Sequence, residues 1–142
     1  MSTFDAILLA VDQSGPSDRA VEVARDLATL SRGTVHLLHI REIEVIVGKA
    51  GGTFELETDE DVETLLQKEI SVLRDGNVKM SVDVRRAHES EAARTIIEVA
   101  DEVGAGIVVM GSRGQSALAA LVLGSTAYKV LHTAHRPVLI VP

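Results

Sequence analysis

Glycine and hydroxyl residues gather in one stretch near the carboxyl end of the chain. Residues 111–126, GSRGQSALAALVLGST, hold three glycines and an adjacent hydroxyl pair: Gly111, Gly114, Gly124, Ser125 and Thr126. Glycine lets a backbone turn sharply and approach a ligand without a Cβ in the way. Gly124 interrupts an apolar run, so we expect a new helix at about Ser125, with unpaired amides and the positive end of its dipole exposed. This arrangement predicts a phosphate-binding cradle.

The same residues allow a purely structural interpretation. Gly111 and Gly114 alone could form an ordinary turn between a strand and a helix. Arg113, between them, could reach a phosphate or lie in solvent. Asp12, at the end of the first apolar run, could cap a helix or bond the amides of its turn as well as contact a ligand. The residue types leave these alternatives open.

Catalytic signatures are missing from the sequence. It contains no G-x-x-x-x-G-K-[ST], no G-x-G-x-x-G and no G-x-S-x-G pattern. In GKAGGTF, residues 48–54, the residue directly after Lys49 is neither Ser nor Thr. We therefore expect a mobile flap over the site rather than a phosphate loop. The five histidines lack metal-ligand spacing, and His39 is expected to be a core histidine with its hydrogen bonds satisfied. We therefore expect a binding site with no catalytic residue and no metal held by side chains.

Strands and helices that could position these residues alternate along the chain. Apolar or alternating runs predict five strands, at 6–11, 35–40, 78–85, 107–110 and 138–141. Helical stripes predict helices over 17–30, 58–73 and 93–103, and another from about Ser125. Thr58 and Asp61 resemble a capping box, whereas residues 41–57 have no clear period and are expected to form a loop.

The order of these elements predicts an α/β fold. Strands separated by helices give a doubly wound, five-stranded parallel sheet with helices on both faces, in one domain over residues 1–142. The strict alternation in 78–85 predicts a strand at or near the sheet edge. Ligands bind beyond the carboxyl ends of such strands. VDQSG and MGSRG would face each other across one crevice if the first and fourth strands are neighbours.

Composition excludes several classes of function. The chain has 142 residues, no cysteine, a net charge of −7 and 2% aromatic residues. Zinc–thiolate sites, iron–sulfur clusters and disulfides are therefore excluded, and nucleic-acid binding lacks its basic face. No apolar stretch approaches the ~20 residues of a membrane span, and the amino terminus lacks a basic leader, so a cytoplasmic location away from membranes is expected.

The glycine pattern and its surroundings resemble the universal stress protein family. The likeness includes G111-x-x-G114, nine residues and then G124-S125, together with LLAVDQS, IVVMGSRG and HRPVLIVP. It covers the whole chain and implies a Rossmann-like fold of the adenine-nucleotide α-hydrolase type. Because the glycines occur at the family's spacing, the cradle is favoured over a simple turn.

The resemblance implies ATP, or a related adenine nucleotide, as ligand, with Mg²⁺ carried on the phosphates. Asp12 would lie near the ribose and the Ile40 backbone would bond the adenine edge. Gly111 and Gly114 would line the ribose and first phosphates. The outer phosphates would be held by Gly124, Ser125 and Thr126. A homodimer through strand 137–141 is also implied.

Three hypotheses about function follow. The first is an ATP-binding stress or signalling protein that acts as a nucleotide-dependent switch and is at most a slow ATPase. The second is a dimeric interaction module that binds no nucleotide. The third is an enzyme that activates a substrate by adenylation, for which the sequence offers neither a second pocket nor a basic catalytic signature. The first is favoured.

Overall fold

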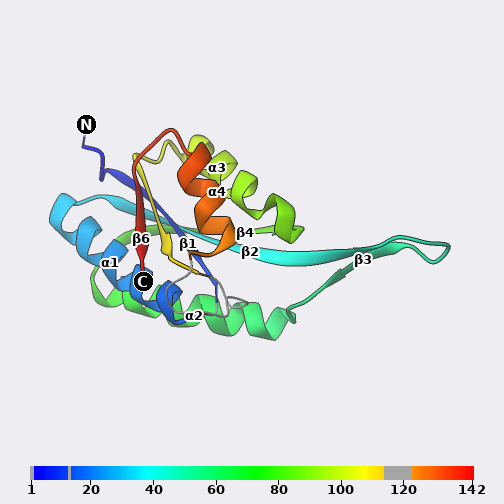
Figure 1. Cartoon of the computed structure of the whole chain (residues 1–142). Coiled ribbons are helices and arrows are strands. Elements are labelled where there is room, and N and C mark those ends of the chain that lie inside the picture. The colour runs from blue at the N-terminus through cyan, green and yellow to red at the C-terminus, as the bar shows by residue number, and fades with distance from the viewer. Residues whose placement is uncertain (1, 13, 114–122) are drawn as a thin grey trace.

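A parallel sheet forms the centre of the structure, a computed structural model that describes residues 2–12, 14–113 and 123–142 (Figure 1). Its parallel strands lie in the order β4 (Lys79–Ala87), β2 (Thr34–Ile46), β1 (Ala6–Val11), β5 (Ile107–Gly111) and β6 (Val138–Val141). The prediction of a five-stranded parallel sheet is therefore confirmed. β4 pairs with β2 at one edge, as its alternating pattern predicts.

Helices cover both faces of this sheet. α1 (Gly15–Ser31) and α2 (Asp59–Asp75) lie below it in Figure 1, and α3 (Ala92–Val103) and α4 (Ser125–Thr133) lie above it. Each face has its own apolar cluster: Leu9, Val21 and Leu73 pack in the first, and Leu8, Ile96 and Val130 in the second. None of the helices in the described residues is both long and apolar enough to cross a bilayer.

The predicted helix boundaries have clear local causes. Ser14 caps α1 by accepting a hydrogen bond from the Ser17 amide. Thr58 and Asp61 form the expected capping box at the start of α2. α3 follows a short 3₁₀ helix, η1 (Glu89–Glu91), and ends at Gly104, whose φ of 65° lies in the left-handed region that favours glycine.

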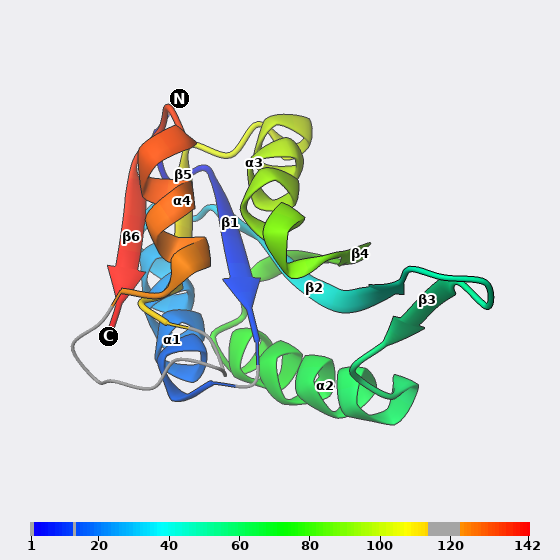
Figure 2. The same cartoon turned by 45° about the vertical axis from the view of Figure 1, so that its right-hand side comes forward.

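The expected loop over 41–57 is wrong in its main part. β2 continues to Ile46 and pairs with an antiparallel strand, β3 (Gly52–Glu55), so that a hairpin projects from the sheet (Figures 1 and 2). Val45, Ile46 and Phe54 stay at least 47% exposed on this ribbon. Its apolar side chains face solvent instead of a core, so the usual one-sided burial pattern of a strand is weak here. Residues 48–54 form its outer part and are not among the cavity-lining residues described below, so the expected flap over the site is also wrong.

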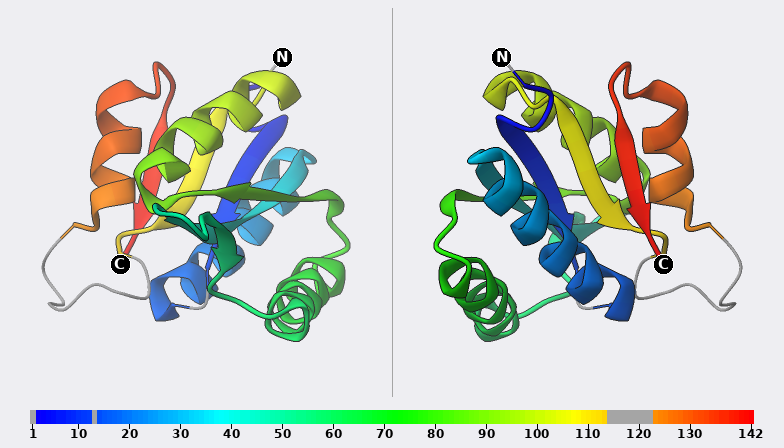
Figure 3. Two further views of the ribbon diagram at one scale, coloured as in Figure 1. Left: turned by 90° about the vertical axis from the view of Figure 1, so that its right-hand side faces the viewer. Right: turned by 90° about the vertical axis from the view of Figure 1, so that its left-hand side faces the viewer.

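β1 and β5 lie side by side in the middle of the sheet, with Leu8 paired to Val108 and Ala10 to Met110. Their carboxyl ends, together with that of β6, point to the same edge of the molecule (Figure 3). The turns after β1 and β5 therefore meet where parallel α/β sheets bind ligands.

Candidate functional site

A cavity of about 470 Å³ opens at the carboxyl ends of the parallel strands. Six of the residues predicted to bind a ligand line it: Asp12, Ile40, Gly111, Gly124, Ser125 and Thr126. The seventh, Gly114, lies outside the described residues. Arg113 also lines the cavity. The fold thus brings together side chains and backbone from β1, β2, β5 and α4.

The amino end of α4 faces this cavity. Gly124 has an extended backbone, with φ −62° and ψ 154°, and its carbonyl accepts from the Tyr128 amide at 2.9 Å. Its own amide donates to the Ser112 carbonyl at 2.7 Å, which ties α4 to the end of β5. Within the described residues, no side chain caps this helix. The first-turn amides after Gly124 are therefore available to an anion, as expected from the sequence.

Gly111 is required for packing. A Cβ added there would lie 2.9 Å from Pro16 Cβ and 3.0 Å from the Ser17 amide nitrogen, in the first turn of α1. Ordinary Cβ contacts are longer than this, so a larger residue would push α1 and β5 apart. The glycine thus lets two walls of the cavity approach closely.

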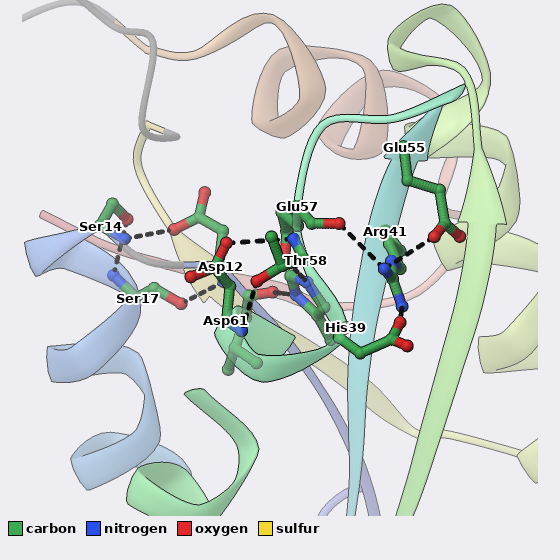
Figure 4. Close-up of polar contacts among 11 residues, drawn as sticks. Asp12, Ser14, Ser17, His39, Arg41, Glu55, Glu57, Thr58 and Asp61 are labelled. Atoms are coloured by element: carbon green, nitrogen blue, oxygen red, sulfur yellow. Dashed lines mark hydrogen bonds and ion pairs between the residues drawn. The ribbon is translucent and has the colours of Figure 1, made fainter. Parts of the chain in front are cut away.

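Asp12 organises the turn between β1 and α1 (Figure 4). Its Oδ1 accepts from the Ser14 amide at 2.8 Å, and its amide donates to Ser17 Oγ at 2.7 Å. Of the two structural roles considered for it, bonding the turn amides is confirmed, whereas Ser14 caps the helix. Asp12 also lines the cavity, so its carboxylate serves the turn while facing the site.

The backbone at Ile40 lies at a gap in strand pairing. Pairing of β2 with β1 ends at His39 opposite Val11, and pairing with β3 starts at Ile43 opposite Glu55. Within the described strand registers, Ile40 is paired only with Arg85 of β4. One edge of β2 is therefore open there, and it borders the cavity.

The cavity residues that were not predicted from the sequence include Glu42, Leu56, Glu57 and Glu89. The first three belong to the hairpin region that was expected to be a loop. Burial raises the pKa of Glu42, and the carboxylates of Glu89, Glu57 and Asp12 act in the same direction. The alternation of glutamate with Ile43 and Val45 is the signal that could have identified this extension of β2.

Buried polar contacts fix the base of the hairpin next to the cavity (Figure 4). His39 is 1% exposed; its Nδ1 lies 2.8 Å from the Val11 carbonyl and its Nε2 lies 2.8 Å from Glu57 Oε2. The expectation of a satisfied core histidine is confirmed. Arg41 is also buried, and its guanidinium lies 2.7 Å from Glu55 and 2.6 Å from Asp59. These contacts therefore hold the base of the hairpin against the start of α2.

Comparison with known protein families identifies the relatives of this chain. Residues 3–142 match the model of the universal stress protein family. The chain belongs to this family. The universal stress protein YxiE of Bacillus subtilis is 30% identical over 146 residues, which cover 97% of this chain and 99% of that protein.

Solved structures of this family share the fold. A universal stress protein from Archaeoglobus fulgidus aligns with a TM-score of 0.73 and 26% identity, over 96% of this chain and 98% of that one. Another from the same organism, described as a complex with dAMP, aligns with a TM-score of 0.70 and 23% identity, over 99% of this chain and 100% of that one.

The polar groups of the cavity suit an anion better than a metal ion held by side chains alone. In the part of the chain that the structure describes, no group of three or more His, Asp or Glu side chains is placed to hold a metal. The groups near α4 are amides and hydroxyls, which donate hydrogen bonds to phosphate oxygens.

Proposed function

We propose that this chain binds ATP or a related adenine nucleotide and acts in a stress response or in signalling as a nucleotide-dependent switch. The observation that carries the proposal is the relation between two open backbone edges. The uncapped amino end of α4 and the unpaired edge of β2 at Ile40 border the same cavity. One edge offers donors to phosphates, and the other offers a donor and an acceptor to a base.

The phosphates bind at the amino end of α4. The amides of Ser125 and Thr126 are first-turn donors, and their hydroxyls add further donors. Gly111 lines the ribose and the first phosphates, and Gly124 lets the chain enter the helix beside the outer phosphates. Arg113, which also lines the cavity, offsets part of the phosphate charge.

The base and the ribose bind on the β1 and β2 side. The amide and the carbonyl of Ile40 bond the adenine edge, since neither β1 nor β3 is paired with this residue. Asp12 accepts from a ribose hydroxyl while it holds the Ser14 amide. The related protein from Archaeoglobus fulgidus described in complex with dAMP, a purine nucleotide, supports this class of ligand.

Mg²⁺ suits this site as part of the ligand. It would neutralise phosphate charge in a cavity that four carboxylates also line: Asp12, Glu42, Glu57 and Glu89. Of these four, Asp12 lies in the turn between β1 and α1. No residue is assigned a catalytic role. Slow hydrolysis by an adventitiously oriented water is the most that this arrangement offers.

The switch acts within a homodimer formed through strand 137–141. β6 is an edge strand, paired with β5 on one side, and Leu139 and Ile140 remain partly exposed. An edge strand presents unpaired backbone groups to a second copy. Sedimentation at micromolar concentration would give twice the mass of the chain, and a monomer at all concentrations would reject this part of the proposal.

The alternative function, a dimeric module that binds no nucleotide, is favoured by one observation. Gly111 is explained fully by its contact with Pro16, without a ligand. The two functions differ in what the purified protein contains. We would denature it, identify any released molecule by mass spectrometry, and titrate the stripped protein with ATP and Mg²⁺ by calorimetry.

A substitution at Ser125 tests the helix end directly. Ser125 is the first residue of α4, where proline is tolerated, and Gly124 before it is already extended. Ser125→Pro removes one amide donor and one hydroxyl, whereas the matched control Ser125→Ala removes only the hydroxyl. We expect the proline variant to bind ATP about tenfold more weakly than the alanine variant. Equal ATP affinities in the two variants would exclude the helix end from phosphate binding.

A further inference from the structure

Glu42 lies beside the open edge of β2, on a defined side of the sheet. Alternate residues of a strand share one face, so the side chains of Ile40 and Glu42 project to the same side. Ile40 packs against the apolar cluster beneath α3 and α4. Glu42 therefore projects above the sheet, at the end of the cavity where the adenine base is proposed to bind. Ile96 and Glu89 also line the cavity.

The Glu42 carboxyl is free to contact a ligand. Its neighbours on the hairpin are held by cations or by the imidazole ring: Glu55 contacts Arg41, and Glu57 contacts His39. Among the side chains that the structure describes, none donates a hydrogen bond to Glu42. Its backbone carbonyl is occupied, because it accepts from the Leu56 amide at 3.3 Å. Only its side chain is available to a molecule in the cavity.

The direction of β2 determines which part of a base would face Glu42. In any residue the carbonyl lies on the carboxyl-terminal side of the amide, so the Ile40 carbonyl is the group nearer to Glu42. Adenine has a ring nitrogen that accepts and, next to it, a 6-amino group that donates. A base that bonds both groups of Ile40 places its 6-amino group over the Ile40 carbonyl, on the Glu42 side.

We propose that Glu42 selects the substituent at position 6 of a bound purine, accepting a hydrogen bond from a 6-amino group and rejecting a 6-oxo group. This inference rests on the proposed function. An ionised carboxylate can only accept hydrogen bonds, and a 6-oxo oxygen can also only accept. The two would face each other without a proton between them in a partly buried site, which is costly.

Protonation of Glu42 would relax this selection. A neutral carboxyl has one donor, so it can bond a 6-oxo oxygen as well as a 6-amino group. Burial raises the pKa of Glu42, and the carboxylates of Glu89, Glu57, Asp12 and Glu44 act in the same direction, so the neutral form is favoured. The preference for 6-amino purines should therefore increase with pH as Glu42 ionises.

ATP and inosine triphosphate are suitable probes, because they have the same ribose and phosphates and differ in the base around position 6. We would measure both dissociation constants by calorimetry for the wild type, Glu42→Gln and the control Glu44→Gln. Glu44 is two residues further along β2 on the same face and carries the same charge, but it is not among the cavity-lining residues. We expect the wild type to prefer ATP by about tenfold or more. Glu42→Gln should lower the ratio, because an amide both donates and accepts, while the Ile40 backbone still favours a 6-amino purine. Glu44→Gln should keep the wild-type ratio.

Several outcomes would overturn the inference. Equal affinities for the two nucleotides in the wild type, or a Glu42→Gln ratio equal to that of the wild type, would each exclude this role of Glu42 while leaving nucleotide binding intact. A wild-type protein that binds neither nucleotide would reject the proposed function and this inference together. If Glu42→Gln does not fold, the wild-type ratio measured from pH 4.5 upward to 8 replaces it, because the pKa of Glu42 is raised from 4.5, and a ratio that does not change with pH rejects the proposal.

Discussion

His39 Nε2 and Glu57 Oε2 lie 2.8 Å apart, which joins β2 to the segment that follows β3. The Val11 carbonyl on the other side of the ring can only accept, so His39 Nδ1 carries a hydrogen. A second hydrogen must lie between His39 Nε2 and Glu57 for that short contact to be attractive. A single buried side chain thus connects the end of β1, the middle of β2 and the wall of the cavity.

Replacing His39 should destabilise the protein. His39→Leu replaces the ring with an apolar side chain and leaves the Val11 carbonyl and the Glu57 carboxyl without this partner, so we expect a loss of roughly 1–3 kcal/mol in the free energy of unfolding. Urea denaturation measures it. His36→Leu is the matched control in the same strand, because the hydrogen bond that the described residues give His36 is to Ser81, in an exposed pair. A loss no larger than the control's would show that the His39 contacts contribute nothing net.

Stability should fall as pH rises toward 8. Glu69 in α2 is 1% exposed. Its burial and the neighbouring Asp18 raise its pKa from 4.5 to about 8, against the opposing effect of Lys68. The folded protein thus holds a proton that the unfolded chain has released, so stability present below pH 4.5 is lost as pH rises through about 8.

Glu69→Gln should remove most of this pH dependence and stabilise the protein at pH 8 by about 1–3 kcal/mol. Urea midpoints at pH 5, 6, 7 and 8 test it, with Glu60→Gln on the exposed face of the same helix as control. The pKa of Glu42 is also raised, so the stability of Glu69→Gln should still fall somewhat as pH rises. An equal slope in Glu69→Gln and the wild type would contradict the assignment.

Gly111→Ala should weaken the contact between α1 and β5. The new Cβ would meet Pro16 at 2.9 Å, and both partners belong to packed elements, so we expect a loss of roughly 1–3 kcal/mol in the free energy of unfolding. Gly52→Ala is the control, because a Cβ at Gly52 meets nothing within 4 Å. Thermal denaturation of both variants measures this loss of stability. Equal melting temperatures would mean that α1 shifts to accept the new Cβ without destabilising the protein.

Removal of Mg²⁺ should weaken ATP binding more than AMP binding. Four carboxylates line the cavity, so a free triphosphate brings more uncompensated charge into it than a monophosphate does. Calorimetry with and without chelator should show about a tenfold loss of affinity for ATP and a smaller loss for AMP. Equal losses for both nucleotides would show that the metal does not act through the outer phosphates.

The sequence predicted the elements whose causes are local. Continuous apolar runs indicated the buried strands, and Thr58 with Asp61 indicated the start of α2, because a capping box forms within four residues. Gly124 likewise predicted where α4 begins.

Features that depend on distant contacts could not be predicted in this way. The hairpin is exposed on both faces, so the burial pattern that identifies a strand is weak at Val45 and Phe54. Glu57 became part of the site through contacts with distant residues: its side chain with His39, 18 residues earlier, and its carbonyl with Arg41, 16 residues earlier. Gly111 was predicted as a ligand contact, but the need for glycine comes from Pro16, in another element.

The gap in pairing at Ile40 and the uncapped end of α4 have a genetic consequence. Both offer main-chain groups, which every residue except proline carries in full. A saturation-mutagenesis screen for loss of nucleotide binding should therefore tolerate other apolar residues at Ile40 and small residues at Ser125, and recover proline at both positions. Lineages of this chain can therefore change the side chains at these two positions and keep the main-chain groups proposed to hold the ligand.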